Sequence, residues 1–293
     1  MQVDNSQNLS SFAIITPSYD QDFQRCQLLC KSISRFVQPP FKHYIVVEKR
    51  DLKLFSQLKN QHTEIIIVQD LLPFWLFRLP KIRKTWFSLK GVPVRSWIMQ
   101  QISKIALSRV IDEEISVFLD SDEMFIRDFG ISNLVKNNQV RFYAEPEGNP
   151  IGMDTPHQHW HQSASRLLGL TATPMPAPDY IADVITWKRE NVTAMCRHIE
   201  RIYHQSWFEA VSKTWHFSEY TLYGTYIDRV LQDRSGHYWD PTKILNSYYD
   251  PNVMTEEELR NFVNSTRPEH VAIMISAKAK IAVDRYASLL ELE

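Results

Sequence analysis

The sequence contains no long apolar run. None of its 293 residues belongs to a stretch of about 18 apolar residues, the length that a helix needs to cross a bilayer. Its first eight residues are polar and lack the basic region with which a signal peptide begins. We therefore expect a chain that does not span a membrane and that resides in the cytoplasm.

Cysteine and glycine are also scarce. Three cysteines are too few for a disulfide framework, and we interpret Cys26, Cys30 and Cys196 as buried thiols of a reducing compartment. There are only seven glycines, and neither Gly-x-Gly-x-x-Gly nor Gly-x-x-x-x-Gly-Lys-Ser/Thr occurs. A dinucleotide dehydrogenase and a P-loop NTPase are therefore not expected. A net charge of −1 favours neither nucleic acid nor a membrane as a general partner, and no nucleic-acid partner is expected.

Short apolar runs alternate with segments of helical period in the first part of the chain. The runs are 12–16, 44–47 and 64–68, and the segments between them are 23–37 and 52–58. Runs that are continuously apolar are typical of parallel strands covered on both faces. This order predicts an α/β fold with a mixed, mostly parallel central sheet flanked by helices.

An acidic turn follows another apolar run, Val117–Leu119. It consists of Asp120, Ser121, Asp122 and Glu123. In open α/β sheets, ligands bind outside the carboxyl ends of the strands. Two carboxylates spaced Asp-x-Asp can share a Mg²⁺ or Mn²⁺ ion, which prefers oxygen ligands and is often held together with substrate phosphates. The alternative is a solvated turn that ends a strand.

Residues 71–111 are basic and aromatic. No acidic residue lies between Asp70 and Asp112, whereas eight basic residues do: Arg78, Lys81, Arg83, Lys84, Lys90, Arg95, Lys104 and Arg109. Three interpretations stay open. The segment is a solvated loop, a diphosphate-binding surface facing the acidic turn, or, over 71–90, a peripheral contact with anionic lipid.

The second half offers further local signals. A helix is predicted from Ser96, and Ser218 is a predicted N-cap with Glu219 in the first turn, where the helix dipole favours negative charge. Thr255 and Glu258 form a capping-box pattern. The region 145–178 contains six prolines and is predicted to be irregular, and His157, His159 and His161 within it are not expected to bind a metal.

Four stretches in this order resemble a GT-A-fold nucleotide-sugar glycosyltransferase, and more narrowly an uncharacterised bacterial family of domain-of-unknown-function proteins. They are Phe12–Asp20, Arg95–Ala106 with its Trp-x-x-Gln-Gln-x-x-Lys pattern, Phe118–Phe125, and Phe217–Gly224 with Phe-Ser-Glu-Tyr. The likeness extends over most of residues 12–276. It implies one Rossmann-like domain over 1–293, with a nucleotide-binding half at 12–125 and an acceptor-binding half at 126–293.

The resemblance also implies an activity and a set of site residues. A sugar would pass from a nucleotide-diphosphate donor to an acceptor that is a sugar, a lipid or a small molecule, with Mn²⁺ or Mg²⁺ on Asp120 and Asp122. Glu219 is the expected catalytic base, if the reaction inverts configuration, and Asp183 is the second candidate. The expected donor-binding residues are Thr16, Ser18, Tyr19, Glu48, Arg95, Gln101, Lys104, Asp120 and Lys278.

One feature departs from the GT-A pattern, in which a His after the last strand often completes the metal site. No His stands at that position here. Either His270 or His237 would supply the third metal ligand, or Lys278 would supply positive charge in place of a metal. Two rival functions remain. A haloacid-dehalogenase-like phosphohydrolase would use Asp120 as nucleophile and Asp122 as acid, and a non-catalytic protein would only bind a sugar nucleotide or a membrane surface.

Overall fold

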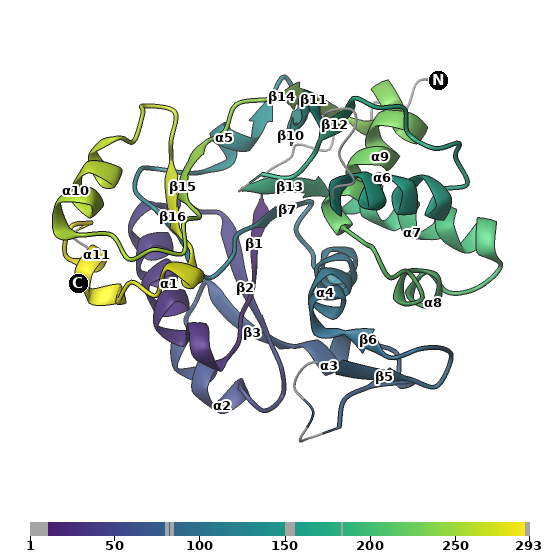
Figure 1. Ribbon diagram of the computed structural model, residues 1–293, viewed down its shortest axis with the longest axis horizontal. Coiled ribbons are helices and arrows are strands. Elements are labelled where there is room, and N and C mark those ends of the chain that lie inside the picture. Colours follow the sequence, from purple (N-terminus) through teal and green to yellow (C-terminus); the bar gives the residue numbers. More distant parts are fainter. Residues whose placement is uncertain (1–10, 80–81, 83–84, 150–155, 183, 291–293) are drawn as a thin grey trace.

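A five-stranded sheet forms the centre of the computed structural model, which describes residues 11–79, 82, 85–149, 156–182 and 184–290 (Figure 1). Its strand order is β13-β7-β1-β2-β3. β1, β2, β3 and β7 run parallel, and β13 is antiparallel to β7. The strand bounds are β1 Phe12–Pro17, β2 Phe41–Val47, β3 Thr63–Ile67, β7 Ile115–Phe118 and β13 Ile185–Lys188. The predicted mixed, mostly parallel α/β fold is confirmed.

Helices cover both faces of this sheet. Alternate residues of β1 point to opposite faces and pack against different helices. Phe12 and Ile14 pack in one core with α1 (Phe23–Phe36), and Ala13 and Ile15 pack in another with α4 (Ser96–Val110). Helices α7 (Arg189–Tyr203), α8 (Trp207–Ser212) and α9 (Glu219–Tyr226) extend the second core. The sheet is thus buried on both faces, as its continuous apolar strands predict.

Side chains cap two helices at the predicted residues. The Ser218 hydroxyl accepts a hydrogen bond from Thr221 N at 3.2 Å at the start of α9. Thr255 and Glu258 form a reciprocal capping box at the start of α10 (Glu256–Asn264). These bonds satisfy amide groups that a helix start leaves without a partner inside the helix.

Helices and strands occur in two segments: the basic segment, for which a loop was one of three interpretations, and the region 145–178, which was predicted to be irregular. The described residues between 68 and 95 include α3 (Val68–Leu71) and a meander of β4 (Leu76–Phe77), β5 (Thr85–Ser88) and β6 (Val94–Arg95). The region 145–178 contains β11 (Glu145–Asn149), α6 (Pro156–Leu167) and the start of β12 (Ala177–Asp179). The prediction of an irregular 145–178 region is therefore wrong for 145–149, 156–167 and 177–178, whereas residues 168–176 contain no helix or strand.

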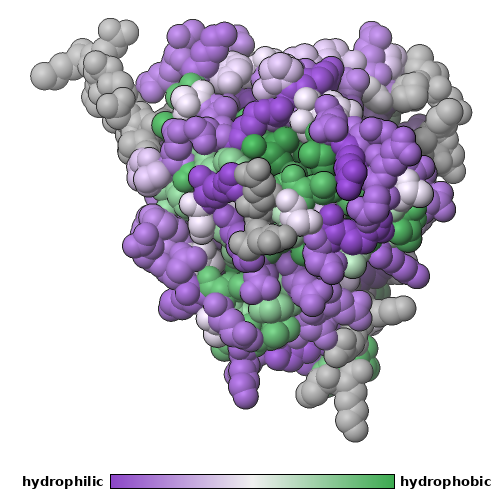
Figure 2. All heavy atoms as spheres, turned by 90° about the vertical axis from the view of Figure 1, so that its left-hand side faces the viewer, coloured by the Kyte–Doolittle hydropathy of each residue, from purple (hydrophilic) through white to green (hydrophobic). Residues whose placement is uncertain are grey.

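A second, smaller sheet brings the end of the chain to the acidic turn. β8 (Glu123–Phe125) pairs antiparallel with β16 (Ala272–Ile275), and β16 pairs parallel with β15 (Leu245–Tyr248). Since β8 follows the acidic turn directly, the residues after β16 lie beside that turn. α10 and α11 (Val283–Ala287) lie near this sheet, on a side of the molecule that Figure 2 shows as largely hydrophilic with smaller hydrophobic areas near its centre.

The remaining elements connect these layers. They are the 3-10 helices η1 (Asp20–Asp22), η2 (Ser56–Leu58), η4 (Gln232–Ser235) and η5 (Ala277–Ala279), the π-helical turn η3 (Ile227–Leu231), the helices α2 (Leu52–Phe55) and α5 (Ile131–Leu134), and the strands β9 (Val135–Lys136), β10 (Gln139–Tyr143) and β14 (His237–Asp240). Among the described residues, no helix is long and apolar enough to cross a membrane.

Candidate functional site

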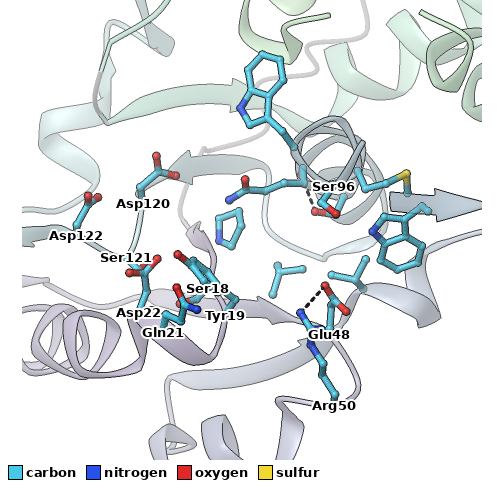
Figure 3. Close-up of a pocket in the computed structure, with 18 of the residues that line it drawn as sticks. Ser18, Tyr19, Gln21, Asp22, Glu48, Arg50, Ser96, Asp120, Ser121 and Asp122 are labelled. Carbon is cyan, nitrogen blue, oxygen red and sulfur yellow. Dashed lines mark hydrogen bonds and ion pairs between the residues drawn. The ribbon is translucent and has the colours of Figure 1, made fainter. Parts of the chain in front are cut away.

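A cavity of about 700 Å³ lies at the carboxyl ends of the parallel strands. Residues that follow β1, β2 and β7 line it, and Lys278 joins them from η5 after β16. In Figure 3 the acidic turn lies on one side and Glu48 with Arg50 on the other, with Ser18 and Tyr19 between them. The cavity is therefore at the edge of the sheet where the open α/β topology predicts a ligand.

The acidic turn presents its two aspartates differently. The Asp120 side chain is 58% exposed, whereas Asp122 is largely buried and its Oδ2 accepts a hydrogen bond from Ala277 N at 2.9 Å. Burial raises the pKa of Asp122 to about 6, Ala277 N–H opposes that rise, and the charge of Asp120 adds to it. Asp122 thus ties the turn to the residues after β16.

Asp22 is a third carboxylate at this end of the cavity and is not among the residues predicted from the sequence. It belongs to η1, directly after the β1 loop, and pairs with Arg25 at 3.4 Å. Burial raises its pKa, Arg25 opposes this, and Asp120 raises it further. Its signal in the sequence is its place just beyond a parallel strand, the same criterion that identified Asp120.

Glu48 joins the meander to the end of β2. Its carboxylate forms ion pairs with Arg78, from the turn after β4, and with Arg50 at 3.3 Å. The Arg78 guanidinium also donates to Ser96 Oγ at 3.0 Å. Trp86 of β5 lines the cavity beside Ser96. The basic segment therefore forms one wall of the cavity, with Arg78 held against a carboxylate of the site.

Lys104 connects the cavity to α9. Its ammonium lies 3.1 Å from Glu219 Oε1, donates to Tyr220 Oη at 2.7 Å and lies 3.8 Å from Asp120 Oδ1. Burial disfavours the charged form, but Tyr220, Glu219 and Asp120 outweigh it and hold the pKa of Lys104 well above its usual range. Burial raises the pKa of Glu219, and Lys104 opposes that rise. Glu219 is only 4% exposed and is not among the residues lining the cavity.

The predicted site residues therefore fall into two groups. Six of them line the cavity: Ser18, Tyr19, Glu48, Asp120, Asp122 and Lys278. Thr16, Arg95, Gln101, Lys104 and Glu219 are not among its lining residues, although Lys104 touches Asp120. Asp183 lies outside the described residues.

The other predicted donor residues are engaged elsewhere. Thr16 is buried beneath the sheet edge, 3.1 Å from His43 Nε2. Gln101 Oε1 accepts a hydrogen bond from the backbone N–H of Glu219 at 3.1 Å, whereas the neighbouring Gln100 lines the cavity. Arg95 donates to the Trp215 carbonyl at 2.5 Å and stacks on that indole ring at 4.3 Å.

The histidines considered as third metal ligands do not reach the acidic turn. His270 precedes β16, whereas Ile275 at the other end of β16 donates to Asp122 O at 3.2 Å. Hydrogen bonds hold His237 in the core, with Nε2 2.7 Å from Tyr223 Oη and Nδ1 3.0 Å from Val140 O. Within the described part of the chain, no three His, Cys, Asp or Glu residues are grouped to hold a metal ion.

The donor set at the turn nevertheless suits a hard cation. It consists of carboxylate oxygens, and Asp120 is exposed to the cavity. Mg²⁺ is typically held by one or two carboxylates with waters and substrate phosphates supplying the rest. The two aspartates of the turn therefore fit a cation whose other ligands are waters or phosphate oxygens.

An aromatic rim lies at the α4 side of the cavity. Trp97 lines the cavity, is 46% exposed and lies 5.9 Å from Trp160 of α6, ring centre to ring centre. His159 of α6 stacks on His216 at 4.8 Å, next to Trp215, which is 56% exposed. Residues from three separate segments thus present rings at one place.

Comparison with known proteins gives a fold and a family. No curated protein matches the sequence. Among solved structures, the chain is similar to the apo structure of the bifunctional glycosyltransferase WbbM, with a TM-score of 0.50 and 13% sequence identity over 90% of this chain. It spans 45% of that protein's chain, and at this identity the likeness shows a glycosyltransferase-like fold alone. Residues 11–267 match the model described as Family of unknown function (DUF6492), and the chain belongs to that family.

Proposed function

We propose that this protein is a GT-A-type glycosyltransferase that moves a sugar from a nucleotide-diphosphate donor to an acceptor hydroxyl. The observation that carries the proposal is the cavity at the carboxyl ends of β1, β2 and β7, with Asp120 and Asp122 at one end of it. The glycosyltransferase-like fold supports it. A haloacid-dehalogenase-like phosphohydrolase has no comparable support from the fold.

The lining residues divide into two parts that suit the two ends of such a donor. Ser18, Tyr19 and Glu48 follow β1 and β2 and offer hydroxyls and a carboxylate to a base and ribose. Asp120 and Asp122 lie at the other end (Figure 3), where Lys278 follows Ala277, whose N–H donates to Asp122, and these side chains suit a cation and a diphosphate. A bound Mn²⁺ or Mg²⁺ would supply Lewis-acid stabilisation of the departing diphosphate. Lys278 would add positive charge to the same oxygens.

For Glu219 we propose a positioning role through Lys104 rather than direct contact with the acceptor. A general base must come within hydrogen-bond reach of the proton that it takes. Glu219 is almost fully buried, and its carboxylate is paired with Lys104, which in turn faces Asp120. The pair thereby places a positive charge 3.8 Å from Asp120 Oδ1, which would help to orient that carboxylate.

The activity test is nucleoside diphosphate release from a panel of nucleotide sugars with Mn²⁺ or Mg²⁺. We expect wild-type protein to release the diphosphate and Asp120→Ala to lose on the order of 10²-fold or more of that rate, because the removed carboxylate is a proposed cation ligand. Asp128→Ala, an exposed aspartate eight residues further on that is not among the lining residues, serves as the matched control.

Other outcomes separate the rival functions. Phosphate release from monoesters without diphosphate release would assign a phosphohydrolase. Nucleotide-sugar binding without turnover, in wild type and in the control alike, would assign a binding protein. Equal loss of rate in Asp120→Ala and Asp128→Ala would contradict the proposed role of the acidic turn.

The aromatic rim is the proposed acceptor side, and a sugar ring is the acceptor that it suits best. Indole faces pack against the apolar faces of pyranose rings, and the half-exposed Trp97 lines the cavity. We expect Trp97→Ala to raise the KM for a sugar acceptor roughly tenfold and to leave donor hydrolysis without acceptor unchanged. Trp239→Ala, 49% exposed on β14, is the control. An equal effect of both substitutions would place the acceptor elsewhere.

A further inference from the structure

Three large apolar side chains are exposed together at one end of the meander. Phe74 is 87% exposed, Leu89 70% and Val92 59%. Leu89 N donates to Trp75 O at 3.0 Å, which places Leu89 beside the residue that follows Phe74. Val92 lies in the turn from β5 to β6 at the same end. We call these three residues the meander tip.

The meander tip is supported from beneath and so cannot fold back into the core. Trp75 and Trp86 are 5% and 2% exposed and occupy the core under the meander. The Lys90 ammonium covers the Trp75 ring at 5.2 Å. The apolar space under the tip is therefore already filled, and the three side chains remain in solvent. Clustered exposed apolar groups of this kind mark interaction sites more often than scattered ones do.

The charge around the meander tip is positive. Lys90 and Lys213, 45% and 42% exposed, both pair with Glu209, at 3.0 and 2.9 Å. Gly91 of the tip turn lies against Lys213, since a Cβ there would be 3.4 Å from Lys213 Cε. Two lysines share one carboxylate, which leaves one net positive charge, and the sequence from 71 to 111 contains no acidic residue of its own.

We propose that the meander tip inserts into the headgroup region of a bilayer that contains anionic lipid. Apolar side chains beside lysines match the two forces that hold peripheral proteins on such surfaces, burial of apolar area and attraction to anionic headgroups. A protein partner fits less well, because a stable interface takes about 800 Å² from each side and three side chains of one turn supply only part of that.

The contact would bring the cavity to the membrane surface. The meander that carries the tip also supplies Trp86 to the cavity wall and leads into Ser96 and Trp97 at its edge. An acceptor embedded in or attached to the bilayer would then meet the cavity without leaving the surface. The binding itself does not depend on the proposed transferase activity.

Vesicle co-sedimentation tests the inference without any turnover assay. Wild-type protein is expected to sediment with vesicles of phosphatidylcholine and phosphatidylglycerol, less with phosphatidylcholine alone, and less again as salt is raised. Phe74→Glu/Leu89→Glu should lower the partition coefficient on anionic vesicles by at least roughly tenfold, since two apolar contacts become repulsive charges.

Tyr249→Glu/Val253→Glu is the matched control. Tyr249 and Val253 are 63% and 56% exposed and lie near β15 and α10, at the left of Figure 1, whereas β5 and β6 lie at the lower right. The control carries the same added charge and should bind like wild type. All four positions are exposed, and circular dichroism and a thermal midpoint confirm that each variant is folded.

Three results would overturn the inference. The first is wild-type protein that stays in the supernatant with anionic vesicles at low salt, and the second is an equal loss of binding in both double variants. The third is a wild-type dimer in size-exclusion chromatography that Phe74→Glu/Leu89→Glu converts to a monomer without any change in vesicle binding. That result would assign the tip to a second copy of this chain.

Discussion

Lys104→Met is expected to lower the free energy of unfolding by about 3–5 kcal/mol at neutral pH, because it leaves the Glu219 carboxylate buried without its cation. Lys104 and Glu219 are 5% and 4% exposed, so water cannot replace the lost partner. Lys104→Met/Glu219→Gln removes both charges and should recover most of the loss. Urea unfolding of the single and double variants measures both quantities.

Lys90→Met is the matched control for this comparison. Lys90 also pairs with a glutamate, at 3.0 Å, but it is 45% exposed, and exposed ion pairs contribute little to stability. Lys90→Met should therefore lower the free energy of unfolding much less than Lys104→Met does. The Lys104→Met deficit should also shrink as pH falls from 7 to 5, since the unpaired Glu219 can then be protonated. Equal losses in the two lysine variants would refute the buried-pair assignment.

Asp122→Asn is expected to stabilise the cation-free protein while abolishing the proposed cation-dependent turnover. The folded-state pKa of Asp122 is about 6, above its ordinary value of 3.8, so the ionised carboxylate costs the fold stability at pH values above 6. Removal of the charge should therefore raise the free energy of unfolding by about 1–3 kcal/mol at pH 7.5. The gain should fade as pH falls towards 4, where the wild-type carboxyl is itself protonated.

The asparagine also retains the contact that holds the turn. Its side-chain oxygen can accept the Ala277 N–H, which Asp122 Oδ2 accepts at 2.9 Å. Asp122→Ala loses this bond and should not be stabilised. Thermal unfolding in chelator between pH 4 and 8 measures the stability, and nucleoside diphosphate release with Mn²⁺ measures the turnover. An Asp122→Asn variant that is less stable than wild type at every pH would show that the buried charge is better compensated than its surroundings indicate.

Local patterns predicted most of the elements that position the site. The helix from Ser96, the N-cap at Ser218 and the capping box at Thr255 are observed where the sequence places them. α6 was missed because six prolines in 145–178 suggested an irregular region. A helical signal is nevertheless present, since Trp160, Ala164, Leu167 and Leu168 follow a helical period. The helix begins at Pro156, a position at its first turn that tolerates proline.

Helical phase explains why Gln101 was predicted at the site in place of Gln100. Periodicity separates the apolar side of α4 from its other side but does not say which polar neighbour faces a cavity and which faces another helix. Gln101 accepts the amide of Glu219 at the start of α9, and this contact turns it away from the cavity. Gln100, one position earlier, lines the cavity instead.

The sequence by itself determined that Asp120 and Asp122 end a buried strand, because a continuous apolar run can only be covered on both faces and must expose its polar continuation at the sheet edge. Only the tertiary structure decided the neighbours of these aspartates. Lys104 meets Tyr220 across 116 positions of the chain, and Asp122 meets Ala277 across 155. Such contacts depend on which faces of distant elements pack together, and no local pattern of residues encodes that choice.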